Sequence, residues 1–541
     1  MVDIATRVYN HKWKIDPIVR SLIDTDFYKL LMCQSVFRNK PETQVTFSLM
    51  NRSTHIRLAE IVDEGELREQ LDHIRSIKLS RGESTFLRGN TFYGKRQMFS
   101  SEFMEWFENF SLPPYHLEKT NGQYELTFEG KWHEVMLWEV PVLSVLMEMR
   151  SRSVLKTLDR FQLQVLYARA MTKLWEKIER LKGLENLKIA DFGTRRRHSF
   201  LWQDWAVQAM QEGLGVSFTG TSNCLIAMKR DIEAIGTNAH ELPMVYGALA
   251  KSDEELAMAP YQFLADWHEE HDGNLRIILP DTYGTDGFLK NAPDWLSSWT
   301  GMRIDSGDPR VGARNAIKWW RSMGENPKEK LIIFSDGLDV GQIVDLHKEF
   351  SLDVNVSFGW GTNLTNDFRN LVDDSRLDAF SLVCKAATAN GRATVKLSDN
   401  PNKATGPLSE IDRYRRVFSS TFCGVCPRER RGHCTASPGR RLSCTRVRFG
   451  RTCARIRGKE SASRCSPYLS PKYGVHRRIR SPKAANCIDA ALRSGGSRSR
   501  ARSGRCTASA PSVAALGGLS SRQAYLFLAS FAGLRLSPFC G

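Results

Sequence analysis

Short apolar runs that end in glycine and polar residues recur between residues 188 and 385, and this rhythm limits the possible folds most strongly. Helix-like stretches such as RNAIKWWRSM and VGQIVDLHKEF separate several of the runs. Alternating strand and helix signals predict a parallel βα architecture, and eight units favour a closed barrel over the alternative, an open doubly wound sheet. In such a barrel the loops after the strands build the active site. The eight runs are KIADFGTRRR, VSFTGTSN, EAIGTNAHE, RIILPDTYGTD, GMRIDSGDPR, LIIFSDGLD, VNVSFGWGTN and AFSLVCKAAT.

The region before this rhythm, residues 1–140, predicts a mixed α/β domain. Residues 25–39 show helical spacing of apolar side chains, with Asp24 or Thr25 as the N-cap. Other patterns predict two strands and one long helical stretch, at 44–52, 124–130 and roughly 143–182.

Charge separates the last part of the chain from the rest. After residue 418 lie 24 of the 77 basic residues and 3 of the 60 acidic ones, so residues 1–418 hold 53 basic and 57 acidic residues. The formal net charge of +17 therefore comes from the tail. A mildly acidic body argues against a protein built to bind nucleic acid, and we expect no specific nucleic-acid partner.

The tail, residues 419–541, is rich in Arg, Ser, Cys and Gly and has weak periodicity. The motif CGVC with His433 and Cys434 resembles half of a zinc site, but a second pair at suitable spacing is missing. An arginine-rich nucleic-acid-binding tail is a second interpretation. We favour a third, a shifted reading frame, because the composition changes abruptly. Such a segment is expected to be disordered and dispensable for activity.

The body contains three cysteines, Cys33, Cys224 and Cys384, which are too few and too scattered for a disulfide framework. This predicts a reducing, cytoplasmic location. The N-terminus has no apolar stretch typical of a secretory signal, and no run approaches the roughly 20 apolar residues of a membrane helix. We therefore expect no membrane partner.

The motif MRIDSGDPR follows one of the predicted strands. The guanidinium of Arg303 suits a carboxylate or phosphate, and the carboxylates of Asp305 and Asp308 suit Mg²⁺ or ribose hydroxyls. Taken alone, the motif is more typical of a surface loop with an ion pair. Its place after a barrel strand, beside similar loops, favours catalytic and metal-binding roles for both aspartates.

Three further loops carry candidate binding residues. SFGWGTNLTND offers Gly361 and Thr362 as a cradle for phosphate, although a structural turn is the alternative. FSDGLD offers Asp336 for sugar hydroxyls, and DFGTRRRHSF offers Arg195 and Arg196 for an anion. The chain lacks a Walker loop and an H-E-x-x-H motif, so ATP binding of the P-loop kind and zinc-protease chemistry are not supported.

Several motifs occur together and in order: LIDTDFYKLLMCQSVF, DFGTRRRHS, GTSN, GTNAHE, MRIDSGDP, SDGLD and GWGTN. Over residues 1–418 the chain resembles bacterial nicotinate phosphoribosyltransferases. The resemblance implies a fold like that of type II phosphoribosyltransferases, an irregular TIM-like α/β barrel with an N-terminal mixed α/β domain. The expected parts are the N-terminal domain, the barrel, a segment returning to the N-terminal domain and the tail, at 1–140, 141–394, 395–418 and 419–541.

The resemblance also implies an activity. The enzyme would transfer 5-phosphoribose from phosphoribosyl pyrophosphate to nicotinate, forming nicotinate mononucleotide in NAD salvage. ATP would be a co-substrate and Mg²⁺ a cofactor, and a homodimer is a further expectation.

Residue roles follow from the same resemblance. His240, in GTNAHE, would otherwise be interpreted as a core residue, a metal ligand or a general base; the resemblance implies a transient phosphohistidine, with Glu241 orienting its ring. Tyr28, Thr237 and Arg303 match nicotinate-site positions, and Thr362 matches a contact to the phosphate of the phosphoribosyl group.

Three alternatives stay open. A related phosphoribosyltransferase would use nicotinamide or quinolinate instead of nicotinate. Another sugar-phosphate barrel enzyme, an isomerase or aldolase, would need a buried lysine or glutamate at a strand end, and Lys385 comes closest to such a lysine. A non-catalytic nucleic-acid binder would act through the basic tail.

Overall fold

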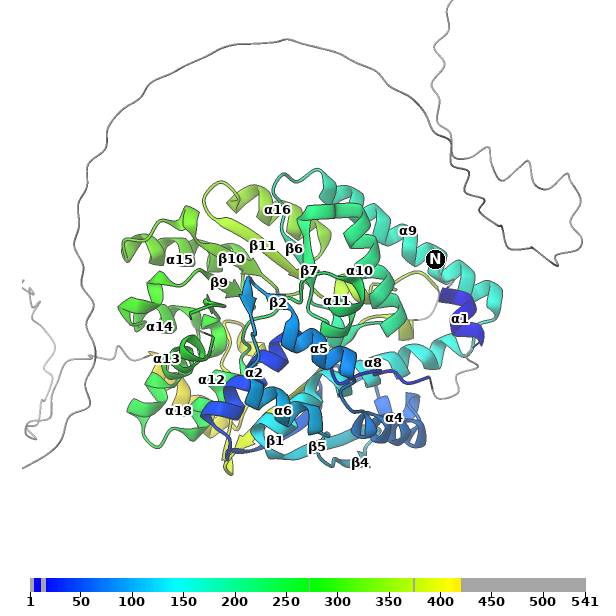
Figure 1. Ribbon diagram of the computed structural model, residues 1–541, viewed down its shortest axis with the longest axis horizontal. Helices are drawn as coiled ribbons and strands as arrows, with labels where there is room; N and C mark the ends of the chain where they lie inside the picture. Colours follow the sequence, from blue (N-terminus) through cyan, green and yellow to red (C-terminus); the bar gives the residue numbers. More distant parts are fainter. Residues whose placement is uncertain (1–3, 11–15, 272, 373–374, 420–541) are drawn as a thin grey trace, which may run out of the picture. The chain divides into compact units, whose positions relative to one another are not determined.

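The computed structural model describes residues 4–10, 16–271, 273–372 and 375–419 (Figure 1). Two large sheets organise these residues. One is antiparallel and takes strands from both ends of the described chain. Its strands, in order across the sheet, are β13 (Arg392–Ala393), β12 (Leu382–Ala389), β1 (Gln44–Asn51), β5 (Gln123–Lys131) and β4 (His116–Thr120).

Helices and a small hairpin accompany the antiparallel sheet, which confirms the mixed α/β character of the N-terminal region (Figure 1). They are α2 (Phe27–Asn39), α3 (Leu58–Ile61), α4 (Glu64–Ser76), α5 (Arg81–Gly89), β2 (Thr91–Phe92), β3 (Lys95–Arg96), α6 (Ser101–Asn109) and α7 (Trp132–Val135). The first helix, α1 (Ile4–Asn10), packs against α9 (Arg160–Lys182) instead.

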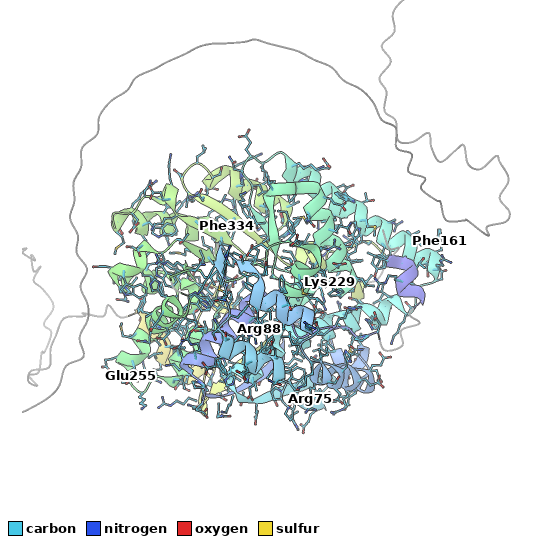
Figure 2. All side chains as sticks on the ribbon, in the orientation of Figure 1. Arg75, Arg88, Phe161, Lys229, Glu255 and Phe334 are labelled. Atoms are coloured by element: carbon cyan, nitrogen blue, oxygen red, sulfur yellow. The ribbon has the colours of Figure 1, made fainter. Side chains whose placement is uncertain are left out.

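The other sheet is parallel throughout and forms the barrel. Its strands, in order, are β7 (Phe218–Thr221), β6 (Ile189–Asp191), β11 (Asn355–Trp360), β10 (Leu331–Phe334), β9 (Gly301–Ile304) and β8 (Ile277–Ile278). Helices surround it (Figure 1): α8 (Glu139–Leu155), α9 (Arg160–Lys182), α10 (Phe200–Leu214), α11 (Cys224–Arg230), α12 (Glu241–Leu249), α13 (Asp253–Glu270), α14 (Thr285–Lys290), α15 (Pro309–Ser322), α16 (Val340–Phe350), α17 (Thr362–Thr365) and α18 (Leu408–Ser419). Figure 2 shows the side chains on this frame, with buried Phe334 among the barrel strands.

The gap between β7 and β8 is closed by an extended segment instead of a regular strand. Ala234 forms a parallel bridge with Thr221, and the Asn238 amide donates to the carbonyl of Ile277 at 2.9 Å. The hydroxyl of Tyr93, from the β2–β3 turn, bonds to the backbone of Gly236. The expected irregular barrel is thus confirmed, and one wall of it includes a side chain from the N-terminal region.

The eighth apolar run does not belong to the barrel, so the prediction of eight barrel units was wrong by one. Residues 382–389 form β12, which pairs antiparallel with β1. The reason lies in the next residues, Asn390 and Gly391, which have φ of +45° and +75°. Asn-Gly in this conformation makes a tight hairpin turn, so the chain folds back into β13 instead of crossing over through a helix.

Two local predictions also differ from the structure. The stretch expected as one helix contains two, α8 and α9, because Asp159 accepts from the backbone of Gln162 and starts a new helix with a capping box. Helix α2 begins after Asp26, not after Asp24 or Thr25. Asp24 is instead buried in an ion pair with Arg197, with Oδ1 at 2.7 Å from Nη1.

The last helix of the described chain, α18, packs against barrel helices. Helix α18 lies against α13 and α14, and its apolar face joins a small cluster with Leu256 and Tyr283. The return to the N-terminal region therefore happens earlier than expected, through β12. The predicted tail, 419–541, lies outside the described residues except for Ser419.

Removing one anchor of α18 tests this packing. Phe418 is buried and stacks on Tyr283 with ring centroids 4.3 Å apart. We expect Phe418→Ala to lower the free energy of unfolding by about 3–5 kcal/mol, the usual cost of deleting a buried phenylalanine. Urea unfolding of the full chain would measure it. Leu408→Ala, at an 81% exposed position of the same helix, is the control and should change it by less than about 0.5 kcal/mol.

Within the described ranges, no helix has the length and apolar character needed to cross a membrane. The three cysteines found there, Cys33, Cys224 and Cys384, are buried free thiols.

Candidate active site

A cavity of about 420 Å³ lies inside the barrel, and we call it the barrel cavity. Six of the residues proposed from the sequence line it, from four separate parts of the chain. They are Tyr28, Arg195, Thr237, His240, Arg303 and Asp305. The loops after β6 and β9 supply Arg195 and Asp305, as expected for a barrel whose active site lies at the carboxyl ends of its strands.

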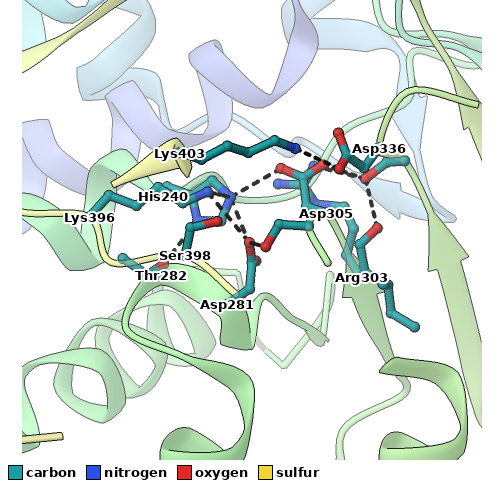
Figure 3. A network of polar contacts seen from close by, with 12 residues as sticks. His240, Asp281, Thr282, Arg303, Asp305, Asp336, Lys396, Ser398 and Lys403 are labelled. Carbon is teal, nitrogen blue, oxygen red and sulfur yellow. Dashed lines mark hydrogen bonds and ion pairs between the residues drawn. The ribbon is translucent and has the colours of Figure 1, made fainter. Parts of the chain in front are cut away.

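His240 is held by polar groups on both ring nitrogens (Figure 3). Its Nδ1 lies 2.9 Å from the Thr282 hydroxyl, and its Nε2 lies 3.0 Å from Asp305 Oδ2 and 2.9 Å from Lys396 Nζ. Asp281 adds a carboxylate 3.6 Å from Nε2. If the proton resides on Nδ1, the Nε2 lone pair faces the cations and carboxylates of the cavity.

Burial lowers the pKa of His240, and Lys396 lowers it further, against the opposing effect of Asp281 and Asp305. The imidazole is therefore neutral at pH 7. Burial alone would raise the pKa of Asp305, but Arg303, His240 and Lys396 outweigh it and hold that pKa well below its usual range. The pair thus combines a neutral, nucleophilic ring with a carboxylate whose low pKa favours its charged form.

Glu241 does not orient the His240 ring, so that expectation was wrong. Its carboxylate is buried, forms an ion pair with Lys29 and accepts from Trp132 Nε1 at 2.7 Å. Lys29 also pairs with Glu139 at 2.5 Å. The glutamate begins α12, so its side chain lies on the packed side of the helix, and it fixes the backbone on which His240 sits.

Tyr28 stands at the start of α2 and is 9% exposed. The Arg195 guanidinium lies 5.6 Å from its ring centroid and pairs with Asp26 at 3.2 Å. Gly236 passes so close to Tyr28 that a Cβ would come within 2.6 Å of the tyrosine nitrogen. Glycine at this position lets the loop carrying Thr237 lie close against the backbone of Tyr28.

Arg303 lies on β9 with its side chain 13% exposed. One guanidinium nitrogen donates to Asp305 Oδ1 at 3.1 Å and to the Ser335 hydroxyl at 3.3 Å. The serine donates in turn to Asp305 at 2.6 Å. These contacts fix the guanidinium in the barrel cavity, where it can pair with a carboxylate.

Five other predicted residues do not line the barrel cavity. Asp308 is exposed and caps α15, where its Oδ1 accepts from the backbone of Arg310 at 2.8 Å. The structure therefore does not bring it together with Asp305. Asp336 is exposed in the loop after β10 and pairs with Lys403 at 2.5 Å (Figure 3). The remaining three, Arg196, Gly361 and Thr362, follow the ends of β6 and β11.

Arg196 is nevertheless suited to hold an anion. Burial lowers its pKa to about 10, with help from Arg195 and Arg52. It has no carboxylate partner among the residues that the structure describes. An anionic substrate would relieve this repulsion between neighbouring cations.

Sequence reasoning missed three polar residues of the site. Asp281 and Thr282 follow β8 in the run RIILPDTYGTD, so their position after a strand was a usable signal. Lys396 had no comparable signal, because it comes from the segment after β13. Only the folding of that segment back over the barrel brings Lys396 to His240.

The residues present fit a magnesium ion that is shared with a substrate. No cluster of three His, Cys, Asp or Glu side chains suited to a metal occurs in the described part of the chain. Mg²⁺ needs only one or two carboxylates when phosphate oxygens complete its shell. Asp305 lines the cavity, and the buried Oδ1 of Asp281, 3.6 Å from His240 Nε2, accepts no hydrogen bond from any described residue. These two carboxylates fit the ion better than the pair Asp305 and Asp308.

Cations gather where the barrel strands end, which is where α/β-barrel enzymes commonly bind phosphorylated substrates. Fold and site together define a barrel enzyme that acts on a phosphorylated anion. Comparison with known proteins narrows the class. Residues 23–147 match the nicotinate phosphoribosyltransferase (NAPRTase) N-terminal domain, and residues 187–422 match the nicotinate phosphoribosyltransferase (NAPRTase) family.

Two solved structures are similar over nearly their whole length. The nicotinate phosphoribosyltransferase of Porphyromonas gingivalis has a TM-score of 0.67 at 27% identity, covering 74% of this chain and 100% of its own. That of Vibrio cholerae has a TM-score of 0.67 at 28% identity, covering 76% and 96%. The chain belongs to the nicotinate phosphoribosyltransferase family. It is accordingly an enzyme of NAD salvage that joins phosphoribose from phosphoribosyl pyrophosphate to nicotinate.

Proposed function

We propose that the enzyme couples this transfer to ATP hydrolysis through a transient phosphohistidine at His240. The observation that supports the proposal is the neutral imidazole in the barrel cavity, with one nitrogen bonded to Thr282 and the other facing Lys396 and Asp305. A neutral ring nitrogen is a nucleophile, and an adjacent ammonium can offset charge on an arriving phosphate.

The phosphorylation step follows from this geometry. The Nε2 lone pair attacks the γ-phosphorus of ATP, so that a P–N bond forms as the P–O bond to ADP breaks. Water later attacks the phosphohistidine, releasing phosphate and the free ring. The phosphorylated ring would carry about −1.5 to −2 charge, by analogy with other phosphorylated residues. It would therefore alter the balance between the cations of the site and the bound pyrophosphate.

The transfer step uses further residues, and Lys396 takes part in both steps. Nicotinate is an aromatic anion, so Arg303 would pair with its carboxylate while Tyr28 covers its ring. The pyridine nitrogen attacks C1 of the ribose as the bond from C1 to the pyrophosphate oxygen breaks. Arg195, Arg196 and Lys396 would stabilise the departing charge. Bound Mg²⁺, held by Asp305 and Asp281, would neutralise part of that charge.

A direct assay tests the coupling. Nicotinate mononucleotide formation is measured at low phosphoribosyl pyrophosphate with and without ATP, together with acid-labile phosphate on the protein. We expect ATP to stimulate turnover and to label the chain. Equal rates with and without ATP, and no labelled protein, would refute the coupling while leaving the transfer itself intact.

The same assay addresses the other candidate bases. Nicotinamide has no carboxylate for Arg303, and quinolinate carries a second carboxylate beside the first. We expect nicotinate to be preferred over both, which competition experiments would show. The alternative of a nucleic-acid binder rests on residues 419–541, beyond the described chain, and predicts salt-sensitive binding that truncation removes.

Lys385 provides a pH-dependent test of the anion site. Burial, Lys396 and Arg52 lower the pKa of its ammonium group to about 7, so the free enzyme at pH 8 holds it mostly neutral. A bound pyrophosphate favours the charged form and raises that pKa. Binding of phosphoribosyl pyrophosphate at pH 8 should therefore take up about one proton, and affinity should fall between pH 7 and pH 9.

Calorimetric titration in buffers of different ionisation enthalpy measures this uptake. Lys385→Met should abolish it. Proton uptake that persists in the methionine variant would assign the titration to another group.

A further inference from the structure

The barrel cavity extends along the whole length of the barrel strands. Asp305, directly after β9, and Thr300, directly before it, both line it. Lys188 and Arg276 line it as well, and they immediately precede β6 and β8. Lys188 and Thr300 are exposed, so the cavity also opens at the end of the barrel opposite to His240.

Small inward-facing residues explain why this barrel is hollow. The interior of an α/β barrel is normally filled by layers of large aliphatic side chains. Here Thr219 on β7 and Ser357 on β11 line the cavity. Because alternate strand residues face the same side, Gly301 shares the inward side with Arg303, and Gly359 shares it with Ser357. The space beside these glycines is taken by Leu331 and by the ring of Phe192, so the open volume lies next to Thr219 and Ser357. Several inward positions therefore contribute little or no side chain to the core.

The two ends of the cavity differ in charge. Among the described residues, the carboxylates that line it are those of Asp26 and Asp305, and both lie at the His240 end. The opposite end has Lys188 and Arg276, and neither has a carboxylate partner within the described residues. The Nε atom of Arg276 is buried there without a hydrogen bond to any described residue. An anion is therefore attracted to this opening.

The walls between the two ends are largely apolar. The apolar and aromatic lining residues are Tyr93, Phe192, Ile235, Leu275, Ile277, Leu331 and Ile333. Such walls suit a flat aromatic ring with one negative charge. They do not suit a pyrophosphate or triphosphate, because stripping water from several charges between apolar walls is costly.

We propose that nicotinate reaches Tyr28 and Arg303 through the barrel cavity, from the opening beside Lys188 and Arg276. Phosphoribosyl pyrophosphate and ATP use the opposite mouth, where the cations next to His240 lie. The two substrates would then bind without blocking each other. This inference rests on the proposed role of Arg303 as the partner of the nicotinate carboxylate, and not on the coupling to ATP.

Two variants of the full-length protein test the route. Ser357→Trp narrows the middle of the cavity. Lys188→Glu reverses a charge at its opening, and because this position is exposed the substitution should not disturb packing. The association rate constant of nicotinate is measured by stopped-flow fluorescence, which needs no turnover, and phosphoribosyl pyrophosphate affinity by calorimetry. Lys348→Glu is the matched control, because it makes the same charge change at an exposed position on α16.

We expect Ser357→Trp to slow nicotinate association by more than about tenfold, and Lys188→Glu to slow it roughly three- to tenfold at low salt. The effect of Lys188→Glu should disappear at high salt, because the side chain is exposed. The affinity for phosphoribosyl pyrophosphate should stay within about twofold in both variants.

Unchanged nicotinate association in both folded variants would overturn the proposal, as would an equal slowing by Lys348→Glu. If Ser357→Trp does not fold, Lys188→Glu alone decides. Should ATP fail to stimulate the wild-type enzyme while Lys188→Glu still slows nicotinate association, the coupling fails and the route stands.

Discussion

Replacing His240 by alanine is expected to abolish ATP stimulation and protein phosphorylation while leaving a slow transfer reaction. The substitution removes the nucleophilic nitrogen that faces Lys396 and Asp305. Transfer itself depends on oriented substrates and charge stabilisation, and neither requires the imidazole. At saturating phosphoribosyl pyrophosphate the variant should still form nicotinate mononucleotide, with ATP hydrolysis reduced to background.

The control for this experiment is His116→Ala. His116 lies on β4 with its side chain 68% exposed, and it has no part in the site. It should keep the wild-type ratio of ATP hydrolysed to product formed. Continued hydrolysis of ATP in step with product formation by His240→Ala would show that another residue carries the phosphoryl group.

Arg303→Ala is expected to lower kcat/KM for nicotinate by roughly 30- to 5,000-fold, which corresponds to about 2–5 kcal/mol for a buried charge left without its partner. Slow turnover of nicotinamide should fall less, because the amide has no charge to pair. The substitution also frees Asp305 from a 3.1 Å contact, so some loss for both bases is expected. Steady-state kinetics with each base would separate the two contributions.

Arg310→Ala serves as the comparison, since this arginine lies on α15 and pairs with Glu349 on the surface. Its kinetics should match those of the wild type. Losses of the same size for nicotinate and nicotinamide in Arg303→Ala would reassign Arg303 to the phosphate part of the site.

The sequence contained enough information for most of the barrel and for its central residues. Most runs that end in Gly and polar residues carry polar residues of the site in or directly after a barrel segment, so His240, Arg303 and Asp305 could be grouped before their distances were known. Asp308 belongs to the same motif as Asp305, but its side chain caps the N-terminus of α15 and does not reach the cavity. Spacing within a loop does not distinguish a ligand from a cap.

The contacts between residues far apart in the sequence could not be predicted from local sequence patterns. The Asn390–Gly391 dipeptide is a hairpin signal that is visible in the sequence. The prediction did not use it, and residues 382–389 were therefore assigned to the barrel and not to the antiparallel sheet. Lys396 reaches His240 only because the chain after that hairpin crosses the barrel mouth, 156 residues from its partner. The buried ion pair of Lys29 with Glu241 likewise joins distant positions whose individual side chains look like ordinary surface charges.

The antiparallel sheet has a consequence for how the chain is made. Strand β1 is paired on one side by β5, but its other edge is covered by β12, with Val45 opposite Ala389. A ribosome adding about 5–20 residues per second needs tens of seconds between these two partners. During that time β1 presents an open hydrogen-bonding edge, which is a template for pairing with other chains. An N-terminal fragment that ends before β12 would keep this edge open, and we therefore expect it to aggregate when it is expressed alone.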